Sequence, residues 1–369
     1  MNKSIKYVTY QTFPAETANS LQTISNIKYL VQNNINVELY FPLREKQSSS
    51  ELQELQNQYN FKEEFKVVGI KHKYLHGKIN FLKPFWYNLS HILWSKKVVQ
   101  NFFKHNTSDV FFTRSDWLAY YLAKQGSIVV FEVHQVSKVR NYVISKIKNF
   151  KNVKFIFLNQ ELSNYYLTPK QSLILHNGVD TSLYSNSELI KRGNHIIYLG
   201  KLSRFNQPRG INQIIHWFND FELKENYTLE IVGGNTSEVD EINKLIQKLN
   251  LTSVVTVSRW LNRKEAIKRI ENSSIGLLVN SNLNTHSKYY TSPLKYFEYL
   301  YAKVKVVAVD FPSHRALPFS TNISFFDENS KESFINALRN LKELEQLNIE
   351  DLNTITLEKR AKKIIEFIF

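Results

Sequence analysis

Short apolar runs that are typical of β-strands alternate with helical patterns along the whole chain. DVFFT at 109–113 and SIVVFEV at 127–133 are continuous apolar runs, as expected of strands that helices cover on both faces of a sheet. The chain opens with a strand at 5–10, a loop, a helical pattern through Val31 and a strand at 37–42. This order predicts an α/β fold with doubly wound parallel sheets, in which ligands bind beyond the carboxyl ends of the strands.

The same order starts again after HNGVD, residues 176–180, whose Asn-Gly pair predicts a turn. A chain of 369 residues is long enough for two domains. We therefore predict an N-terminal domain at 1–175, a second domain at 176–350 and a closing helix within 351–369. Predicted strands of the second half lie at 195–200, 227–234, 254–258, 275–281 and 305–310.

Cysteine is absent from the sequence, which excludes disulfides and thiolate metal sites. The first residues lack the apolar run of a signal peptide. No stretch approaches the ~18 uninterrupted apolar residues of a membrane-spanning helix. We therefore expect a cytoplasmic location.

The chain is strongly basic, with 48 Lys and Arg against 33 Asp and Glu and a net charge of +15. This balance predicts an anionic partner, namely a nucleic acid, a nucleotide or an acidic membrane surface. Residues 66–105 contain eight Lys, four His and no acidic residue, together with many bulky aromatic residues. Two interpretations of this basic stretch stay open. It is either a helix with an aromatic inner face and solvated lysines, or a segment that docks peripherally on the inner face of a membrane.

A nucleic acid is the less favoured partner, because no recognisable nucleic-acid-binding module is present and the basic excess lies beside bulky apolar residues.

Several cationic and glycine residues follow predicted strands of the second half. Lys201, Arg204 and Arg209 lie between the strand at 195–200 and the next helix, an arrangement suited to a diphosphate. The alternative is an ordinary basic surface loop. Gly233 and Gly234 end the neighbouring strand, where a side chain would block a closely bound ligand.

The segment TSPLKYFEYL, residues 291–300, has the signals of a helix start. Thr291 or Ser292 is expected to cap the helix and Pro293 to fit its first turn. Such a helix points its positive end at an anion. Lys295 lies in the first turn and Glu298 about one turn later, so both can face the same side.

These stretches, in this order and spacing, resemble the retaining glycosyltransferases of family 4, within the glycosyl transferases group 1. The matching segments include HNGVD, YLGKL with PRG, LEIVGG, SPLKYFEYL and the tail LEKRAKKIIEFI. In the first half, TRS at 113–115 and FEVH at 131–134 also match. The resemblance implies the GT-B architecture, which consists of two facing Rossmann-like domains with parallel sheets and a C-terminal helix that returns to the first domain.

The resemblance also implies roles for individual residues. Lys201 and Arg209 would hold the donor diphosphate, where the family usually has Arg and Lys in that order. Glu298 would accept hydrogen bonds from the ribose, and Trp260 with Leu261 would pack against the base. His134 would lie near the donor sugar and, with Lys201 and Arg209, is predicted to be catalytic. The remaining predicted donor-binding residues are Gly200, Gly233, Gly234, Ser292, Pro293 and Lys295.

Two features depart from the family. Tyr290 stands where the family has the first of two acids, and the loop at 11–17 has no glycine pair. In that loop, Thr12 and Glu16 are candidates to which no role is assigned. These departures keep a non-catalytic sugar-nucleotide-binding homologue open as an alternative, and a nucleotide-sugar epimerase on the same fold is a weaker one.

The function implied by the resemblance is sugar transfer from a nucleotide-diphosphate sugar to an acceptor hydroxyl, in a hexosyltransferase-like reaction. Cell-surface glycan or lipid-linked saccharide synthesis is the expected setting. No metal or other cofactor is expected. The acceptor is expected to be a sugar or a lipid-linked molecule.

Overall fold

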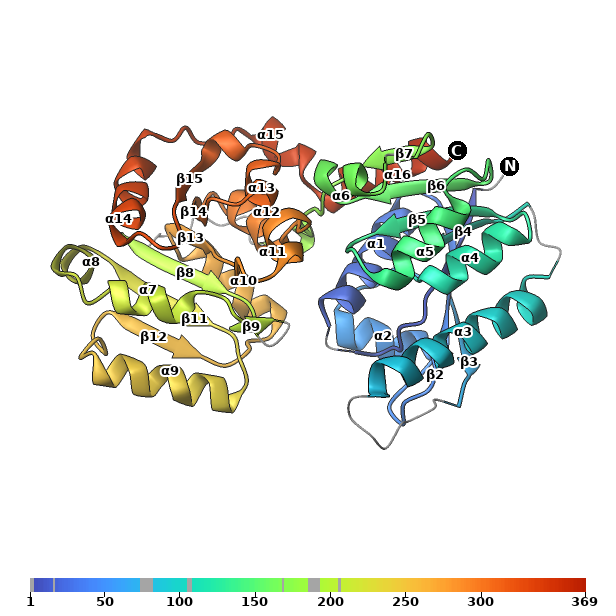
Figure 1. The fold of residues 1–369 in the computed structure, drawn as a ribbon, viewed down its shortest axis with the longest axis horizontal. Coiled ribbons are helices and arrows are strands. Elements are labelled where there is room, and N and C mark those ends of the chain that lie inside the picture. The colour runs from blue at the N-terminus through green and yellow to red at the C-terminus, as the bar shows by residue number, and fades with distance from the viewer. Residues whose placement is uncertain are drawn as a thin grey trace. The chain divides into compact units, whose positions relative to one another are not determined.

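The structure is a computed structural model that describes residues 3–15, 17–73, 82–104, 108–167, 169–184, 193–204 and 207–369. Glu16 and parts of the basic stretch, residues 74–81 and 105, lie outside the described residues. The chain divides into two compact units (Figure 1). Unit 1 comprises residues 1–175 and 357–369, and unit 2 comprises residues 176–356.

Unit 1 is built on a seven-stranded parallel sheet in the order β3-β2-β1-β4-β5-β6-β7. Strand order reverses between β1 and β4, since Ile5 pairs with Val37 of β2 on one side and with Val110 of β4 on the other. The strands are β1 Ser4–Val8, β2 Asn36–Leu43, β3 Lys66–Lys71, β4 Val110–Thr113, β5 Ile128–Val133, β6 Val153–Phe157 and β7 Ser172–Ile174.

The helices of unit 1 include the last helix of the chain. Leu357, Ala361, Ile364 and Ile368 recur at helical spacing and enter the same core as Ile24 and Ile27 of the first helix. The C-terminal segment therefore completes unit 1. The helices are α1 Ala18–Gln32, α2 Leu52–Tyr59, α3 Lys83–Phe102, α4 Asp116–Lys124, α5 Lys138–Ile147, α6 Gln160–Tyr165 and α16 Leu357–Ile368.

Unit 2 has a six-stranded parallel sheet in the order β12-β11-β8-β13-β14-β15. The first strand, β8, lies between β11 and β13, so the strand order reverses beside it. Its strands are β8 His195–Leu199, β11 Thr228–Val232, β12 Val255–Ser258, β13 Ile275–Leu278, β14 Lys305–Val309 and β15 Ile323–Phe326. A short hairpin follows β8, formed by β9 Ser203–Arg204 and β10 Gln207–Pro208.

Helices cover both faces of this second sheet. Ile196 and Tyr198 of β8 enter one core and Ile197 enters the other, as the alternation of a strand requires. The helices are α7 Ile211–Trp217, α8 Phe221–Asn226, α9 Thr236–Lys248, α10 Arg263–Glu271, α11 Thr285–Tyr289, α12 Leu294–Tyr301, α13 Pro312–Arg315, α14 Lys331–Asn340 and α15 Ile349–Thr354. Three short 3-10 turns lie at Thr181–Leu183, Ser320–Asn322 and Leu341–Glu343.

The prediction of two Rossmann-like parallel sheets is confirmed, with some local corrections. Strands β3 and β15 were not predicted, and β3 lies at the start of the basic stretch, where its flanking lysines obscure a short apolar run. The predicted loop after β8 contains the β9–β10 hairpin.

Candidate functional site

The carboxyl edge of the unit 2 sheet is where predicted donor-binding residues gather. Gly200 directly follows β8, beside the reversal of strand order that favours ligand binding in such sheets. It has a φ of +144°, which only glycine adopts readily. A β-carbon at Gly200 would lie 3.7 Å from Lys295 Nζ and 3.9 Å from Arg209 Nη1. Gly200 therefore lies directly beside two cationic side chains.

The glycine pair after β11 lies in close contact with other parts of unit 2. A β-carbon at Gly233 would lie 2.1 Å from the carbonyl oxygen of Gly200, and one at Gly234 would lie 2.5 Å from Leu202 Cδ1. Contacts within the protein thus already favour glycine at both positions, and the expectation that the pair leaves room for a bound ligand stays a prediction. Gly233 lets the ends of two neighbouring strands approach each other, and thereby holds Gly200 in place.

The start of α12 is not capped as expected. The helix begins at Leu294, with Pro293 at its N-cap position and no side-chain cap. Ser292 instead accepts a hydrogen bond from the Asn177 amide at 3.1 Å, and Thr291 donates to Ser313 Oγ at 3.3 Å. Because both hydroxyls are used by other partners, the prediction that one of them caps the helix is wrong. Among the residues that the structure describes, no side chain therefore caps the positive end of α12.

Lys295 is the most unusual residue of this edge. Its side chain is only 8% exposed, and Nζ has no hydrogen-bond partner among the residues that the structure describes. The ammonium group lies 3.7 Å from the centre of the Tyr198 ring. Burial, and next the charge of Arg209, hold the pKa of Lys295 well below its usual range. A bound anion would relieve both effects.

Arg209 is the second cation at this position, and it too is incompletely bonded. Its Nε is buried without a hydrogen-bond partner in the described part of the chain. Its backbone is held by a 3.0 Å hydrogen bond from its amide to the Leu202 carbonyl. Lys201 is exposed, and the side chain of Arg204 lies outside the described part of the structure. The structure therefore brings Arg209 together with Lys295, which the sequence also assigned to the donor site. The role of Lys201 at the diphosphate stays a prediction.

Glu298 is buried on α12 and forms an ion pair with Arg263, the first residue of α10. Sequence reasoning missed Arg263, although a cation at a helix start just after Trp260 and Leu261 was a usable signal. Trp260 is exposed and Leu261 packs against the core of unit 2.

The segment at 176–184 is hydrogen-bonded to α12 and to Ser292, which precedes that helix. Asn177 donates from both its backbone and its side chain to Ser292, and the Tyr184 hydroxyl donates to the Glu298 carbonyl at 3.3 Å. Val179 forms a parallel bridge with Thr356. HNGVD therefore holds the start of α12 in place.

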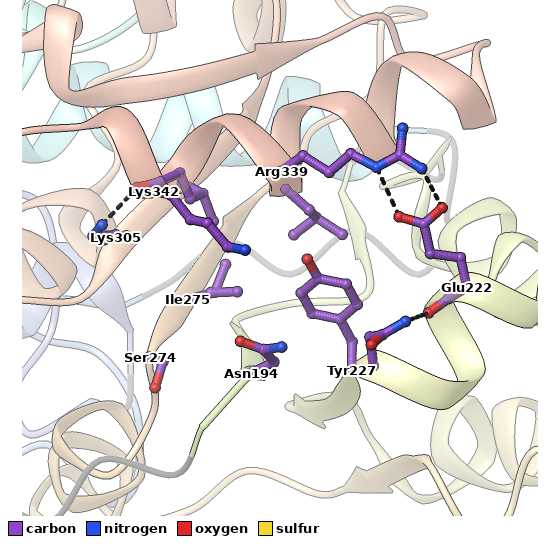
Figure 2. A pocket seen from close by; sticks show the side chains of 11 residues that line it. Asn194, Glu222, Tyr227, Ser274, Ile275, Lys305, Arg339 and Lys342 are labelled. Carbon is purple, nitrogen blue, oxygen red and sulfur yellow. Dashed lines mark hydrogen bonds and ion pairs between the residues drawn. The ribbon is translucent and has the colours of Figure 1, made fainter.

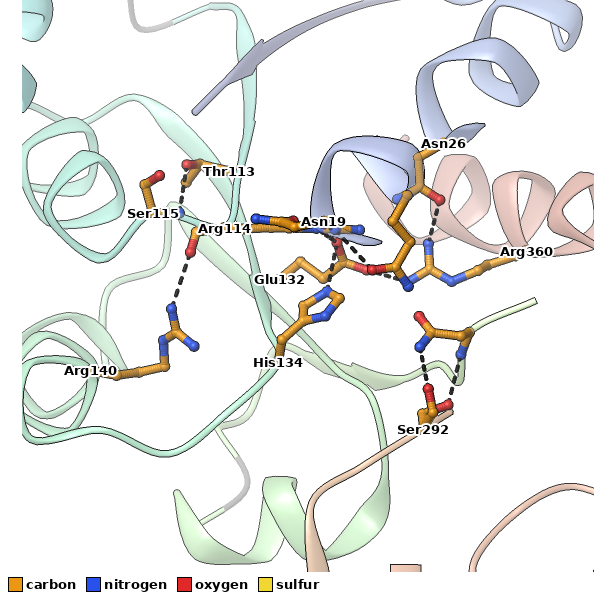
Figure 3. A network of polar contacts seen from close by, with 12 residues as sticks. Asn19, Asn26, Thr113, Arg114, Ser115, Glu132, His134, Arg140, Ser292 and Arg360 are labelled. Atoms are coloured by element: carbon orange, nitrogen blue, oxygen red, sulfur yellow. Dashed lines mark hydrogen bonds and ion pairs between the residues drawn. The ribbon is translucent and has the colours of Figure 1, made fainter. Parts of the chain in front are cut away.

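His134 follows β5 of unit 1 and belongs to a buried polar network (Figure 3). Its Nε2 lies 3.2 Å from Glu132 Oε2. Burial, and next the charge of Arg114, lower the pKa of His134 to about 4. The imidazole is consequently neutral at pH 7.

Glu132 is the centre of this network and was also missed. Its carboxylate is fully buried and receives hydrogen bonds from Arg114 Nε at 2.5 Å and from Arg360 of α16. Burial opposes ionisation of Glu132, but Arg114 and Arg360 outweigh it and hold its pKa well below the usual range. The network therefore joins the end of β5 to the C-terminal helix by charge-assisted hydrogen bonds.

A comparison with known protein families shows which family unit 2 resembles. Residues 184–361 match the family described as glycosyl transferases group 1. The chain carries a group 1 glycosyltransferase domain. Gly200, Arg209, Arg263, Lys295 and Glu298 all fall within the matched residues, so the cationic edge of unit 2 is part of this glycosyltransferase domain. The protein is accordingly a glycosyltransferase.

Solved structures resemble the whole glycosyltransferase chain. Sucrose-phosphate synthase from Thermosynechococcus elongatus is 13% identical, with a TM-score of 0.66 over 100% of this chain and 95% of that one. WaaG, a glycosyltransferase involved in lipopolysaccharide biosynthesis, is 13% identical, with a TM-score of 0.62 over 99% of both chains. Anabaena HepE in complex with UDP is 12% identical, with a TM-score of 0.63 over 99% and 95%. These likenesses confirm the GT-B fold. No curated protein matches the sequence.

A pocket of about 540 Å³ lies elsewhere in the glycosyltransferase domain (Figure 2). It is lined by Asn194, Ile275 and Lys305 at the amino ends of β8, β13 and β14, and by Tyr227 and Arg339. It therefore lies at the opposite ends of the strands from Gly200.

Two further properties concern the described residues only. They contain no group of three or more His, Asp or Glu side chains that could hold a metal ion. None of their helices combines the length and the apolar character needed to cross a membrane.

Proposed function

We propose that this glycosyltransferase is a retaining enzyme of family 4 that transfers a sugar from a nucleotide-diphosphate sugar. The observation that carries the proposal is Lys295, a buried ammonium group without a hydrogen-bond partner in the described chain, in the first turn of an uncapped helix. An unpaired buried cation is unfavourable unless an anion completes it. A donor diphosphate supplies that anion.

The donor would lie at the carboxyl edge of the unit 2 sheet. Its diphosphate would approach Gly200 closely and bind Lys295, Arg209 and the N-terminus of α12. The carboxylate of Glu298 would accept hydrogen bonds from the ribose. Trp260 and Leu261 stay the predicted contacts of the base. Ser292 and Pro293 would shape the backbone that faces the phosphates, and Gly233 and Gly234 would act by positioning Gly200.

The chemistry follows from the charge of the leaving group. As the bond between the anomeric carbon and the diphosphate oxygen breaks, its electron pair passes to that oxygen. Arg209, Lys295 and the α12 N-terminus would stabilise the charge that develops there. The acceptor hydroxyl would attack from the same face of the sugar and pass its proton to the departing diphosphate oxygen, so that the configuration is retained. Lys201 and His134 stay predicted catalytic residues, with His134 acting as a neutral hydrogen-bonding group.

The comparisons support this proposal at the level of donor class. HepE was solved in complex with UDP and glucose, and WaaG is described as involved in lipopolysaccharide biosynthesis. By analogy we propose that this protein works in cell-surface glycan or lipid-linked saccharide synthesis, on a sugar or lipid-linked acceptor.

Donor binding gives the direct test. We expect a thermal-shift panel of UDP, ADP, GDP and their sugar conjugates to contain ligands that raise the melting temperature further as their free concentration increases. Arg209→Ala and Glu298→Ala should each weaken binding of such a ligand by about 10–100-fold, because each removes a charge-assisted hydrogen bond.

Lys244→Ala is the matched control, since Lys244 is an exposed cation on α9 of the same unit. Unchanged affinity in both Arg209→Ala and Glu298→Ala would remove the assignment of this donor site. Binding without transfer or slow hydrolysis would favour a non-catalytic sugar-nucleotide-binding protein.

We also propose that unit 1 docks peripherally on an anionic membrane through α3. The helix buries Trp94, Val98 and Val99, so part of the basic stretch is ordinary core. On its outer side, however, Phe85 is 58% and Leu93 is 50% exposed. Their spacing places them, together with Lys96 and Lys97, within about a third of the helix circumference. Exposed apolar residues beside lysines suit an anionic interface.

Vesicle sedimentation tests this docking. The wild-type protein should sediment with vesicles that contain anionic phospholipid at low salt and should be released as salt rises, because the attraction is screened. Phe85→Ser combined with Leu93→Ser should reduce the bound fraction severalfold. Phe221→Ser, at an apolar residue of unit 2 that is 79% exposed, is the control. If wild-type protein stays in the supernatant at low salt, α3 is an ordinary solvated helix.

A further inference from the structure

We propose that Arg263 is a positioning residue that holds the Glu298 carboxylate ready for a ribose diol, so that the donor site selects ribonucleoside diphosphates over their 2′-deoxy forms. The inference rests on the proposed donor site. It adds a residue that neither the sequence motifs nor the family resemblance identified.

The ion pair between these two residues is built into the packing of unit 2. Arg263 Nη2 donates to Glu298 Oε1, and the Glu298 side chain is 3% exposed while that of Arg263 is 35% exposed. Helices α10 and α12 pack together through a shared core that includes Ile267, Ile270 and Phe297. The backbone positions of both partners are therefore fixed by apolar contacts.

The backbone at Arg263 is also held by a local cap. Asn262 Oδ1 accepts a hydrogen bond from the Glu265 amide at 2.9 Å, and Asn262 Nδ2 donates to Glu265 Oε2 at 3.0 Å. This cap orders the first turn of α10. The Arg263 backbone consequently has a defined position, from which its side chain contacts Glu298.

The charge of Arg263 matters as well as its position. Burial would lower the pKa of Arg263, but the Glu298 carboxylate outweighs this and raises it. The two residues thus form an ion pair whose carboxylate is almost fully buried. Removing Arg263 would leave that carboxylate without its nearest counter-charge and free to rotate.

The Glu298 carboxylate can accept more hydrogen bonds than the one it receives from Arg263. An ionised carboxylate can accept about four hydrogen bonds, and the bond from Arg263 uses one position on Oε1. The remaining positions suit the two adjacent hydroxyl groups of a ribose. A 2′-deoxyribose supplies only one of them. Because a carboxylate that is held in place loses little entropy on binding, its discrimination between the two sugars should depend on Arg263.

The location of Arg263 agrees with this role. It follows Trp260 and Leu261 by three and two residues, so the predicted base contacts and the predicted ribose anchor meet where β12 leads into α10. Recognition of the whole nucleoside would then be concentrated at one junction, separate from the diphosphate cations at Gly200.

Calorimetric titration of the full chain with UDP, ADP and GDP, each beside its 2′-deoxy form, tests the proposal. We expect the wild type to bind the preferred ribonucleotide about 10–100-fold more tightly than its deoxy form, since the lost hydrogen bond is to a charged acceptor. Arg263→Met should reduce this ratio to below about 3-fold while inorganic pyrophosphate binds as before. Arg263→Lys should restore part of the ratio, because it keeps the charge without the planar guanidinium group.

Lys264→Met, at the exposed neighbouring cation, should leave the ratio unchanged. An unaltered ratio in Arg263→Met overturns the role of Arg263 while the donor site stands. If Arg263→Met does not fold, Arg263→Lys and Arg263→Gln replace it in the test. An unaltered ratio of ribonucleotide to deoxyribonucleotide affinity in both variants would likewise overturn the role of Arg263. Equal binding of ribose and deoxyribose forms by the wild type, or no binding of any nucleotide, overturns the ribose assignment itself and this inference with it.

Discussion

Lys295→Met should abolish donor binding and, at the same time, make the ligand-free protein more stable. The wild-type ammonium group is buried without a hydrogen-bond partner in the described chain, and Arg209 repels it. Burying such a group costs on the order of 1–3 kcal/mol, which methionine of similar length avoids. We therefore expect the melting temperature to rise by several degrees. Donor affinity should fall by about 100-fold or more.

The pH dependence of this effect has a definite sign. The folded-state pKa of Lys295 is lowered, so the unfolded chain binds more protons than the folded protein at pH values between the lowered pKa and the ordinary value of about 10.4. The contribution of Lys295 to the free energy of unfolding of the wild type therefore rises with pH over that window. The difference in melting temperature between Lys295→Met and wild type should be largest below the window and shrink as pH increases.

The groups that act on Lys295 come from the loop before α7, from α12 and from β8. Arg209 lowers its pKa, Glu298 on the same helix raises it, and Tyr198 of β8 lies beneath its ammonium group. Burial lowers the pKa of His314 on α13, and the charge of Lys295 lowers it further. Lys244→Met, at an exposed cation of α9, should show neither the stabilisation nor the loss of donor binding. A Lys295→Met protein that is less stable than wild type, or that keeps its donor affinity, would contradict the assignment.

Glu132→Gln should destabilise unit 1 by about 3–5 kcal/mol. The substitution preserves shape but removes a carboxylate that Arg114 and Arg360 share. Both guanidinium groups are buried, and breaking one side of a buried ion pair leaves uncompensated charge. Calorimetric or denaturant unfolding would measure the loss.

Hydrogen exchange would show which residues lose stability in Glu132→Gln. Because Arg360 belongs to α16, the amides of Leu357–Ile368 should lose protection in Glu132→Gln, together with those at the end of β5. Glu161→Gln, at an exposed acid on α6, is the matched control. If Glu132→Gln stays within about 1 kcal/mol of wild type and keeps α16 protected, the network does not anchor the C-terminal helix.

Lowering the pH should weaken the Glu132 network only below the usual range of carboxylate titration. Glu132 has a folded-state pKa well below its usual value, so its contribution is complete above the unfolded value of about 4.3. It is lost as pH falls through the folded-state pKa. In Glu132→Gln this part of the acid sensitivity should disappear.

The sequence by itself determined the architecture of the protein. Continuous apolar runs such as SIVVFEV predicted strands buried on both faces, and β5 lies where that run predicted it. Glycine after β8 and cations after successive strands marked the carboxyl edge of the second sheet, because parallel strands bring their ends together whatever the details of packing. Local periodicity and turn chemistry were sufficient for these conclusions.

Only the tertiary structure decided which side chains meet. Arg263 and Glu298 are 35 residues apart, and Glu132 and Arg360 are 228 residues apart, so no local pattern could pair them. The same holds for Ser292, which looked like a helix cap and instead accepts a hydrogen bond from Asn177, 115 residues away. Sequence patterns report the conformational preferences of neighbouring residues. The partner of a polar side chain is decided by which groups burial brings within hydrogen-bonding distance, and that depends on the whole fold.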